Sequence, residues 1–352
     1  MKMTKLGFAG ILSFTLLYSA LSAEKKPSKP AEKDQTVIRA NVEMVSLPVV
    51  VSDRQGRRIT NLKKEDFQVF ENGIEQEIAG FGATDEPVDV ALLLDTSGST
   101  EHELARIQNA AIEFVHQLHP DDEVAVLSFA EDVKLQQDFT INRDRNEYGI
   151  KKTRTGECTV AYEAVWLTLE EVLKPKIERK ALVIFSDGVD TCSSKASQKE
   201  TLELAKETQA TIYSVFYDTQ DDQYRRTTPG GYPGGTQIPP IWNPTPPYGV
   251  PRSTRTNPIP GGSTTQDDYR AGKAYLSNLA EYSGGLLYDG MQDLGHAFSE
   301  VARELASQYS IGYYSTDNKH DGKFRKIEIK LKQPGLVART KKGYFALKDS
   351  KK

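Results

Sequence analysis

Between about Val88 and Gln308 the chain alternates buried-strand patterns with helical patterns, and this alternation constrains its fold more than any other feature. Four apolar runs have the composition of strands that are covered on both faces: VDVALLLD, EVAVLSFA, ALVIFSDG and TIYSVFY. In the segments between and after these runs, apolar residues recur every three or four positions, as on one face of a helix. Repeated strand–helix units predict an α/β fold with a doubly wound, mostly parallel sheet.

The same patterns place the individual elements. Helices are expected near residues 104–118, 160–173, 198–208, 269–282 and 294–308. The run VKLQQDF, which follows the second apolar run, is expected to be an edge strand of the sheet, and GLLYD a further short strand.

Strand patterns also occur at both ends of the chain, outside this region. Apolar residues alternate from Val45 to Val51, and Asn72-Gly73 separates two further strand runs, which is a strong signal for a two-residue hairpin. Near the other end, KIEIKL alternates charged and apolar residues. Neither set of strands is large enough to close a core alone. We therefore expect both sets to pair into one small β-sandwich, into which the α/β domain is inserted.

Composition and charge exclude one class of partner. The chain has 352 residues, of which 38% are hydrophobic and 27% charged, as in a globular protein. Its formal net charge is -4, and no basic stripe interleaved with aromatic residues occurs in it. Nucleic acid is therefore not expected as a partner.

The first residues have the pattern of a secretory signal. Lys2 and Lys5 precede an apolar stretch from Leu6 to Leu17, and small residues follow. This stretch is too short for a spanning helix, which needs roughly 20 apolar residues. We therefore expect export with cleavage, a mature chain without a membrane span, and a secreted, periplasmic or cell-envelope location.

These patterns give a plan of the whole chain. Residues 218–268 contain ten of its 17 prolines, so this segment is expected to be a Pro/Gly-rich loop inserted into the α/β domain. The expected parts are a signal peptide at 1–23, a linker at 24–37, the first half of the sandwich at 38–85, the α/β domain at 86–307 with its insertion at 218–268, the second half of the sandwich at 308–347 and a tail at 348–352.

A group of hard oxygen donors accompanies the strand ends. Asp95, Ser97 and Ser99 come at the end of VDVALLLD, Asp187 comes at the end of ALVIFSD, and Thr159 precedes an expected helix between them. In a doubly wound sheet, ligands bind beyond the carboxyl ends of the strands, so these side chains are expected to share one rim. A set of carboxylate and hydroxyl oxygens favours Mg²⁺ or Mn²⁺, with Ca²⁺ as a further candidate, over zinc or copper.

The two cysteines of the chain lie next to these residues. Cys158 directly precedes Thr159, and Cys192 follows Asp187 by five residues, so both belong to neighbouring loops of the rim. We expect a disulfide between them, with two buried free thiols as the alternative. Asp190 is expected to be a turn residue.

The motif D-x-S-x-S after a buried strand, a threonine ahead of a middle helix and the strand end FSDG together resemble the von Willebrand factor A domain over about residues 86–307. The segments LPVVVSDRQG, DFQVFENG and KKGYF resemble exported bacterial proteins of the VWFA-related type. The resemblance implies an integrin-like metal-ion-dependent adhesion site. In such a site Ser97, Ser99 and Thr159 contact the ion directly, while Asp95 and Asp187 act directly or through water.

Two features depart from the family pattern. A glycine commonly precedes the family threonine, and Cys158 stands there instead. The insertion at 218–268 is longer than the ordinary loop at that point.

The chemistry of the five residues favours binding over catalysis. Two carboxylates only just balance a divalent ion, so its open position attracts an acidic side chain, and we expect a non-enzymatic adhesion-type module whose protein partner presents Asp or Glu. Alternatives stay open: Ser97 and Ser99 merely cap the following helix, the protein is an envelope scaffold without metal, or it is a Mg²⁺-dependent phosphotransferase. The last has the weakest support, because haloacid-dehalogenase-like enzymes usually carry a second aspartate where Ser97 stands.

Overall fold

The computed structural model describes residues 44–176, 179–217, 264–290 and 293–346. The chain divides into two compact units, residues 1–41 and 42–352, and all described residues belong to the second. The signal peptide expected at 1–23, the linker at 24–37, the tail at 348–352 and most of the insertion at 218–268 therefore lie outside the described residues.

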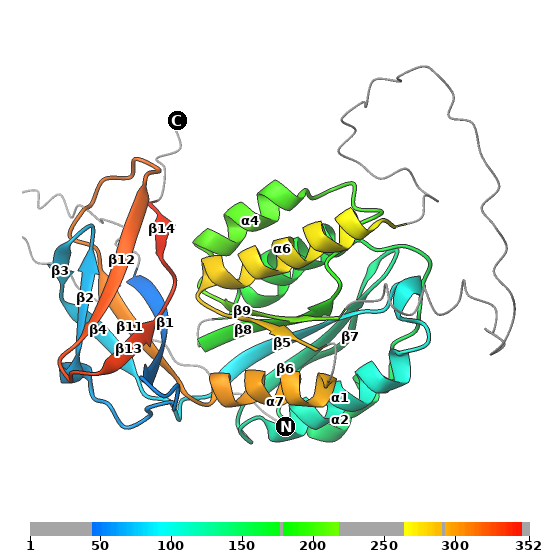
Figure 1. Cartoon of the computed structure of the whole chain (residues 1–352), viewed down its shortest axis with the longest axis horizontal. Helices are drawn as coiled ribbons and strands as arrows, with labels where there is room; N and C mark the ends of the chain where they lie inside the picture. Colours follow the sequence, from blue (N-terminus) through cyan, green and yellow to red (C-terminus); the bar gives the residue numbers. More distant parts are fainter. Residues whose placement is uncertain (1–43, 177–178, 218–263, 291–292, 347–352) are drawn as a thin grey trace, which may run out of the picture. The chain divides into compact units, whose positions relative to one another are not determined.

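A six-stranded sheet in the order β10-β9-β8-β5-β6-β7 forms the middle of the α/β part (Figure 1). Neighbouring strands run parallel, except that β7 pairs antiparallel with β6 at the edge. The strands are β5 (Val88–Asp95), β6 (Glu123–Phe129), β7 (Val133–Thr140), β8 (Arg179–Ser186), β9 (Thr211–Phe216) and β10 (Leu287–Asp289). This confirms the predicted fold class and the edge strand predicted at VKLQQDF.

Helices cover both faces of this sheet, because successive residues of a strand point to opposite sides. Within β5, Val90, Leu92 and Leu94 lie in one apolar core, and Ala91 and Leu93 lie in the other. The first core is covered by α1 (Leu104–Gln117), α2 (Arg143–Lys152) and α7 (Leu294–Leu305), and the second by α3 (Ala161–Leu167), α4 (Gln198–Glu207) and α6 (Gln266–Ser283) (Figure 1). Among the helices of the described ranges, none has the length and apolar character needed to cross a bilayer.

Two helices differ from the sequence prediction, and the helix expected near 160–173 is present but changes type along its length. α2 is not among the predicted helices, because its sequence RDRNEYGIKK has Ile150 as its one buried large apolar residue. α3 continues as a π-helix over Thr168–Leu173. α7 ends before the expected position, because the Ser307 hydroxyl satisfies the Arg303 carbonyl at 2.8 Å and a strand begins at Gln308.

Two four-stranded sheets, β13-β1-β11-β4 and β14-β12-β2-β3, contain the strands from the two ends of the described chain. β1 pairs antiparallel with β11, and β2 pairs antiparallel with β12. Leu47 of β1, Val69 of β2, Tyr313 of β11 and Ile327 of β12 lie in one apolar core, so the two sheets form the predicted sandwich. The strands are β1 (Met44–Asp53), β2 (Phe67–Glu71), β3 (Ile74–Gln76), β4 (Ile78–Gly82), β11 (Gln308–Tyr314), β12 (Phe324–Leu331), β13 (Leu336–Arg339) and β14 (Gly343–Phe345).

The hairpin predicted at Asn72-Gly73 connects β2 to β3. Both residues have positive φ, 49° for Asn72 and 82° for Gly73. A two-residue type I′ turn requires this left-handed backbone at both positions, and Asn-Gly tolerates it best. The turn thereby sets Glu71 opposite Ile74.

One side chain connects the two points where the chain enters and leaves the α/β part. Arg179, the first residue of β8, donates to the carbonyl of Glu86 just before β5 at 2.5 Å. It also donates to the carbonyl of Leu305, the last residue of α7, at 2.9 Å. A single guanidinium therefore holds both crossing segments together.

Candidate metal centre

Asp95 ends β5 and is fully buried. Its Oδ1 accepts hydrogen bonds from the Ser97 hydroxyl at 2.6 Å and the Ser97 amide at 3.0 Å, and its Oδ2 accepts one from the Ser186 hydroxyl at 2.6 Å. Burial raises the pKa of Asp95, and these hydrogen bonds act in the opposite direction. A cation beside this carboxylate would favour its ionised form.

A row of oxygen atoms continues from Asp95 across the rim. The hydroxyl oxygens of Ser97 and Ser99 lie 3.1 Å apart, and the Ser99 hydroxyl donates to Oδ2 of Asp187 at 3.5 Å. Oδ1 of Asp187 accepts a hydrogen bond from the Val189 amide at 2.9 Å. Because β5 and β8 are neighbours in the sheet, the two aspartates at their ends meet at one rim, as the sequence predicts.

The hydroxyls of Ser97 and Ser99 do not cap a helix. Ser97 precedes a 3-10 turn over Gly98–Thr100, but its side chain makes no capping hydrogen bond there, and Ser99 lies inside the turn. α1 begins later, after Glu103. The alternative in which both serines merely cap the following helix is therefore wrong.

Thr159 lies in the loop before α3 and is 7% exposed. Its amide donates to Oγ1 of Thr191 at 2.9 Å, and its carbonyl accepts from the amides of Thr191 and Cys192 at 2.9 and 3.0 Å. Three residues earlier, the Gly156 amide donates to the Thr96 carbonyl at 2.9 Å. The loop that carries Thr159 therefore lies between the loops that follow β5 and β8.

The predicted disulfide joins Cys158 to Cys192, with 6.1 Å between their Cα atoms. The chain has two cysteines, and both are used in this bond. The alternative of two free thiols is therefore wrong. The bond links the residue before Thr159 to the loop that follows Asp187.

Ser186 is a site residue that the sequence prediction lacks. Its hydroxyl donates to Asp95 and accepts a hydrogen bond from the Gly188 amide at 2.8 Å. It is 1% exposed and is the last residue of β8. Its one sequence signal is its position directly before Asp187 at a strand end.

Asp190 is the predicted turn residue, and it has a second contact. Its Oδ1 accepts from the Ser193 amide at 3.1 Å, which closes the turn. Its Oδ2 accepts from the Tyr162 amide at 3.0 Å, in the first turn of α3. Asp190 thus fixes the start of the helix that follows Thr159.

Gly188 brings the loop after β8 against α6. It has a φ of +75°, and a Cβ on it would lie 2.4 Å from the Gly272 carbonyl of α6. This close approach allows only a residue without a side chain.

We expect Gly188→Ala to lower the free energy of unfolding by about 2–3 kcal/mol, because it adds a left-handed backbone penalty and a backbone clash. Gly335 is the matched control, since its φ is +85° and a Cβ there would meet nothing within 4 Å. Gly335→Ala should cost about 1 kcal/mol, from the backbone alone. Urea denaturation measures both, and equal losses would show that the approach to Gly272 does not constrain this loop.

The side-chain oxygens of Asp95, Ser97, Ser99 and Asp187 form an oxygen row. The spacing of this oxygen row fits a small divalent cation. Mg²⁺ takes six oxygens at about 2.1 Å, which places adjacent ligand oxygens about 3 Å apart. The serine hydroxyls are 3.1 Å apart, and Ser99 and Asp187 are 3.5 Å apart. Within the described part of the chain, no group of three or more His, Cys, Asp and Glu side chains is placed to hold a metal. A metal at this rim therefore depends on hydroxyl ligands.

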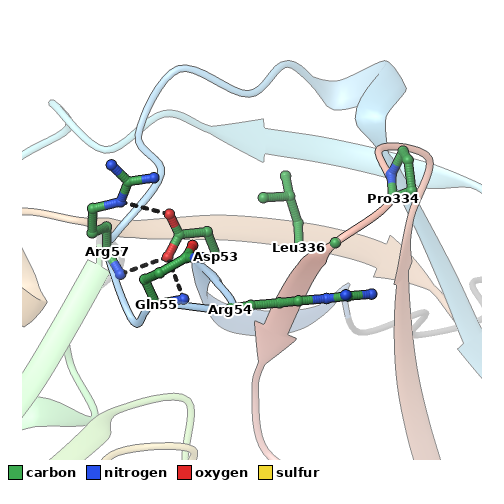
Figure 2. A pocket seen from close by; sticks show the side chains of 7 residues that line it. Asp53, Arg54, Gln55, Arg57, Pro334 and Leu336 are labelled. Carbon is green, nitrogen blue, oxygen red and sulfur yellow. Dashed lines mark hydrogen bonds and ion pairs between the residues drawn. The ribbon is translucent and has the colours of Figure 1, made fainter.

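A pocket of about 440 Å³ belongs to the sandwich and contains none of these residues (Figure 2). Figure 2 shows the Arg57 side chain turned toward Asp53, to which it is paired at 2.7 Å. The pocket is lined by Asp53, Arg54, Gln55, Arg57, Pro334, Gly335 and Leu336. This pocket is therefore separate from the candidate metal centre.

The solved structures that are similar to this chain have low sequence identity to it and low TM-scores. The conserved hypothetical protein BatB from Bacteroides thetaiotaomicron is 16% identical over 62% of this chain and 97% of its own, with a TM-score of 0.41. Proximal thread matrix protein 1 from the mussel byssus, in a structure with a zinc-occupied MIDAS motif, is 15% identical over 66% of this chain and 48% of its own, with a TM-score of 0.40. A von Willebrand factor type A protein from Catenulispora acidiphila is 11% identical over 80% of this chain and 74% of its own, with a TM-score of 0.44. Because these scores are low, we draw neither ligand nor partner from them.

The comparison with protein families is more specific. No curated protein matches the chain. The family model of the von Willebrand factor type A domain matches residues 90–189, a stretch that contains Asp95, Ser97, Ser99, Thr159 and Asp187. Residues 90–189, which include the whole oxygen row, are thus similar to a von Willebrand factor type A domain.

Proposed function

We propose that this chain binds an acidic side chain of a partner protein through a divalent cation held by Asp95, Ser97, Ser99, Thr159 and Asp187. The observation that carries this proposal is the direction of the serine hydroxyls, which turn toward the two carboxylates and not toward a helix end. The similarity of residues 90–189 to a von Willebrand factor type A domain supports it, because such domains often mediate protein interactions.

The donor set determines what the cation would do. Ser97, Ser99 and Thr159 would hold it through neutral oxygens, and Asp95 and Asp187 would balance its two charges. Asp95 also fixes the Ser97 hydroxyl through a 2.6 Å hydrogen bond. The cation, which we propose to be Mg²⁺ or Mn²⁺ with Ca²⁺ as a further candidate, would supply an electrophilic position for the carboxylate of the partner.

Metal-dependent stabilisation tests this centre. At a Mg²⁺ concentration of 100 times Kd, a ligand that binds only the folded state raises the free energy of unfolding by about 2.7 kcal/mol. We expect this gain, measured as a rise in Tm, in the wild type and its loss in Asp95→Asn, which removes one of the two balancing charges. Asp132→Asn is the matched control, because Asp132 is a carboxylate in the loop after β6 whose side chain is 60% exposed and paired with Lys134.

Two outcomes would contradict the proposal. An equal metal-induced shift in the wild type and in Asp95→Asn would place the ion elsewhere. A wild type that responds to none of Mg²⁺, Mn²⁺ and Ca²⁺ would favour the scaffold without metal.

The partner and the reaction class need separate probes. Peptides that present Asp or Glu should bind in Mg²⁺ and dissociate in EDTA, and the same peptides with Asn or Gln should not bind. Hydrolysis of generic phosphoesters that depends on Asp95 would favour the phosphotransferase, against our proposal that the protein is not an enzyme.

We also propose that the protein is exported, to the periplasm, the cell envelope or the medium. The signal-like pattern at 1–23 supports this, and so does the disulfide, because such bonds persist in oxidising compartments. Fractionation of the source cells and the mass of the mature chain test it. A chain recovered from the cytoplasm with residues 1–23 intact would contradict it.

A further inference from the structure

We propose that the Cys158–Cys192 disulfide sets the cation affinity of this rim, so that its reduction by a dithiol weakens metal binding. This inference rests on the function proposed above. It concerns the regulation of the same site and commits to one chemical signal, thiol–disulfide exchange.

The disulfide lies directly beside Thr159 in the sequence. Cys158 is covalently next to Thr159, and Cys192 donates its amide to the Thr159 carbonyl at 3.0 Å. Thr191, the neighbour of Cys192, accepts from the Thr159 amide at 2.9 Å and donates to its carbonyl at 2.9 Å. Both backbone polar groups of Thr159 are therefore bonded to the segment that the disulfide ties down.

Thr159 lacks the strand pairing that holds the two aspartates of the site. Asp95 ends a strand that is paired on both sides, with β6 and β8, and Asp187 directly follows β8. Thr159 follows no strand and lies in the loop before α3. Loosening the contact between its loop and the segment 190–192 would therefore displace Thr159 before it displaces the two aspartates.

Both cysteines are half-buried, so a small dithiol can reach the bond. One thiolate of the reagent attacks a protein sulfur and forms a mixed disulfide, and the other protein sulfur leaves as a thiolate. The second thiol of the reagent then closes its own disulfide. Two electrons pass from the dithiol to the protein, which ends with two thiols.

The expected size follows from a population argument. An apparent Kd equals the intrinsic Kd divided by the fraction of molecules that hold the binding arrangement. If Thr159 is in place in about a tenth of the reduced molecules, Mg²⁺ binds about tenfold more weakly. The same displacement breaks the hydrogen bonds that the amides of Thr191 and Cys192 donate to Thr159.

The experiment uses two readouts at a temperature where all forms are folded. The first is the Kd of Mg²⁺ from calorimetry, for the oxidised protein, the protein reduced with dithiothreitol and Cys158→Ser/Cys192→Ser. The second is amide hydrogen exchange without metal at Thr191 and Cys192. The amides of Ser194 and Lys195, which donate to Glu163 at 2.6 and 2.7 Å in the same loop, serve as the internal reference.

We expect reduction to raise the Kd about tenfold and to speed exchange at Thr191 and Cys192 more than at the reference amides. The double variant should behave like the reduced protein and should not respond to dithiothreitol. An unchanged Kd on reduction, in a protein that binds Mg²⁺, would overturn this inference and leave the proposed function intact. No Mg²⁺ binding in any form would overturn the proposed function and this inference together.

Discussion

Replacing Arg325 by methionine is expected to lower the free energy of unfolding by about 3–5 kcal/mol, because it leaves the buried carboxylate of Glu71 without its cation. Arg325 is 4% exposed and its guanidinium lies 3.1 Å from Asp321, 3.2 Å from Asp317 and 4.0 Å from Glu71. Glu71 is itself 2% exposed. Urea denaturation at neutral pH measures the loss.

The rest of the cluster provides the controls. Glu71 also accepts hydroxyl hydrogen bonds from Tyr313 at 2.8 Å and from Tyr344 at 2.9 Å, and burial raises the pKa of Tyr344 to about 12. The double variant Glu71→Gln/Arg325→Met should recover part of the loss, since it removes an unpaired buried charge. Lys323→Met should change stability by less than about 0.5 kcal/mol, because the Lys323 side chain is 77% exposed. A loss below about 1 kcal/mol in Arg325→Met would show that the acidic groups find other partners or water.

Removing the Cys158–Cys192 disulfide should cost about 4 kcal/mol of global stability. The two residues are 34 positions apart, and in the chain-entropy model the bond restricts the unfolded chain according to the length of the closed loop. Guanidinium denaturation with and without dithiothreitol measures the difference. Cys158→Ser/Cys192→Ser should have the stability of the reduced protein, and its midpoint should not depend on the reductant. A difference below about 1 kcal/mol would mean that the reduced chain is already restricted in its unfolded state.

The sequence predicts the sheet well, and the reason is visible in β5. Its residues from Val90 to Leu94 alternate between two apolar cores, and this continuous apolar run makes the strand easy to recognise. α2 is harder to predict, because Ile150 is its one buried large apolar residue, whereas Tyr148 is exposed. A helix held by so few apolar contacts has no periodic signal to read.

The candidate site divides in a similar way. Asp95, Ser97, Ser99 and Asp187 could be placed together because strand ends converge whatever the details of the packing. Ser186 could not, because its role depends on β5 and β8 being neighbours, with Leu94 opposite Phe185, so that their last residues meet. β6 and β7 separate β5 from β8 in the sequence, so the sequence does not show that β5 and β8 are neighbours in the sheet.

The interleaving of strands in the sandwich has a consequence for the order of folding. β1 to β4 precede the α/β part in the chain, yet β1 needs β11 and β2 needs β12 as partners. Strands so distant in sequence pair slowly, because the two strands must first be brought together. A folded α/β part brings the ends of the two strand sets together, because Arg179 donates to the carbonyls of both Glu86 and Leu305. Until then the early strands have unpaired edges, which bind other chains readily. A defect anywhere in the α/β part should therefore show itself first as aggregation through β1 and β2.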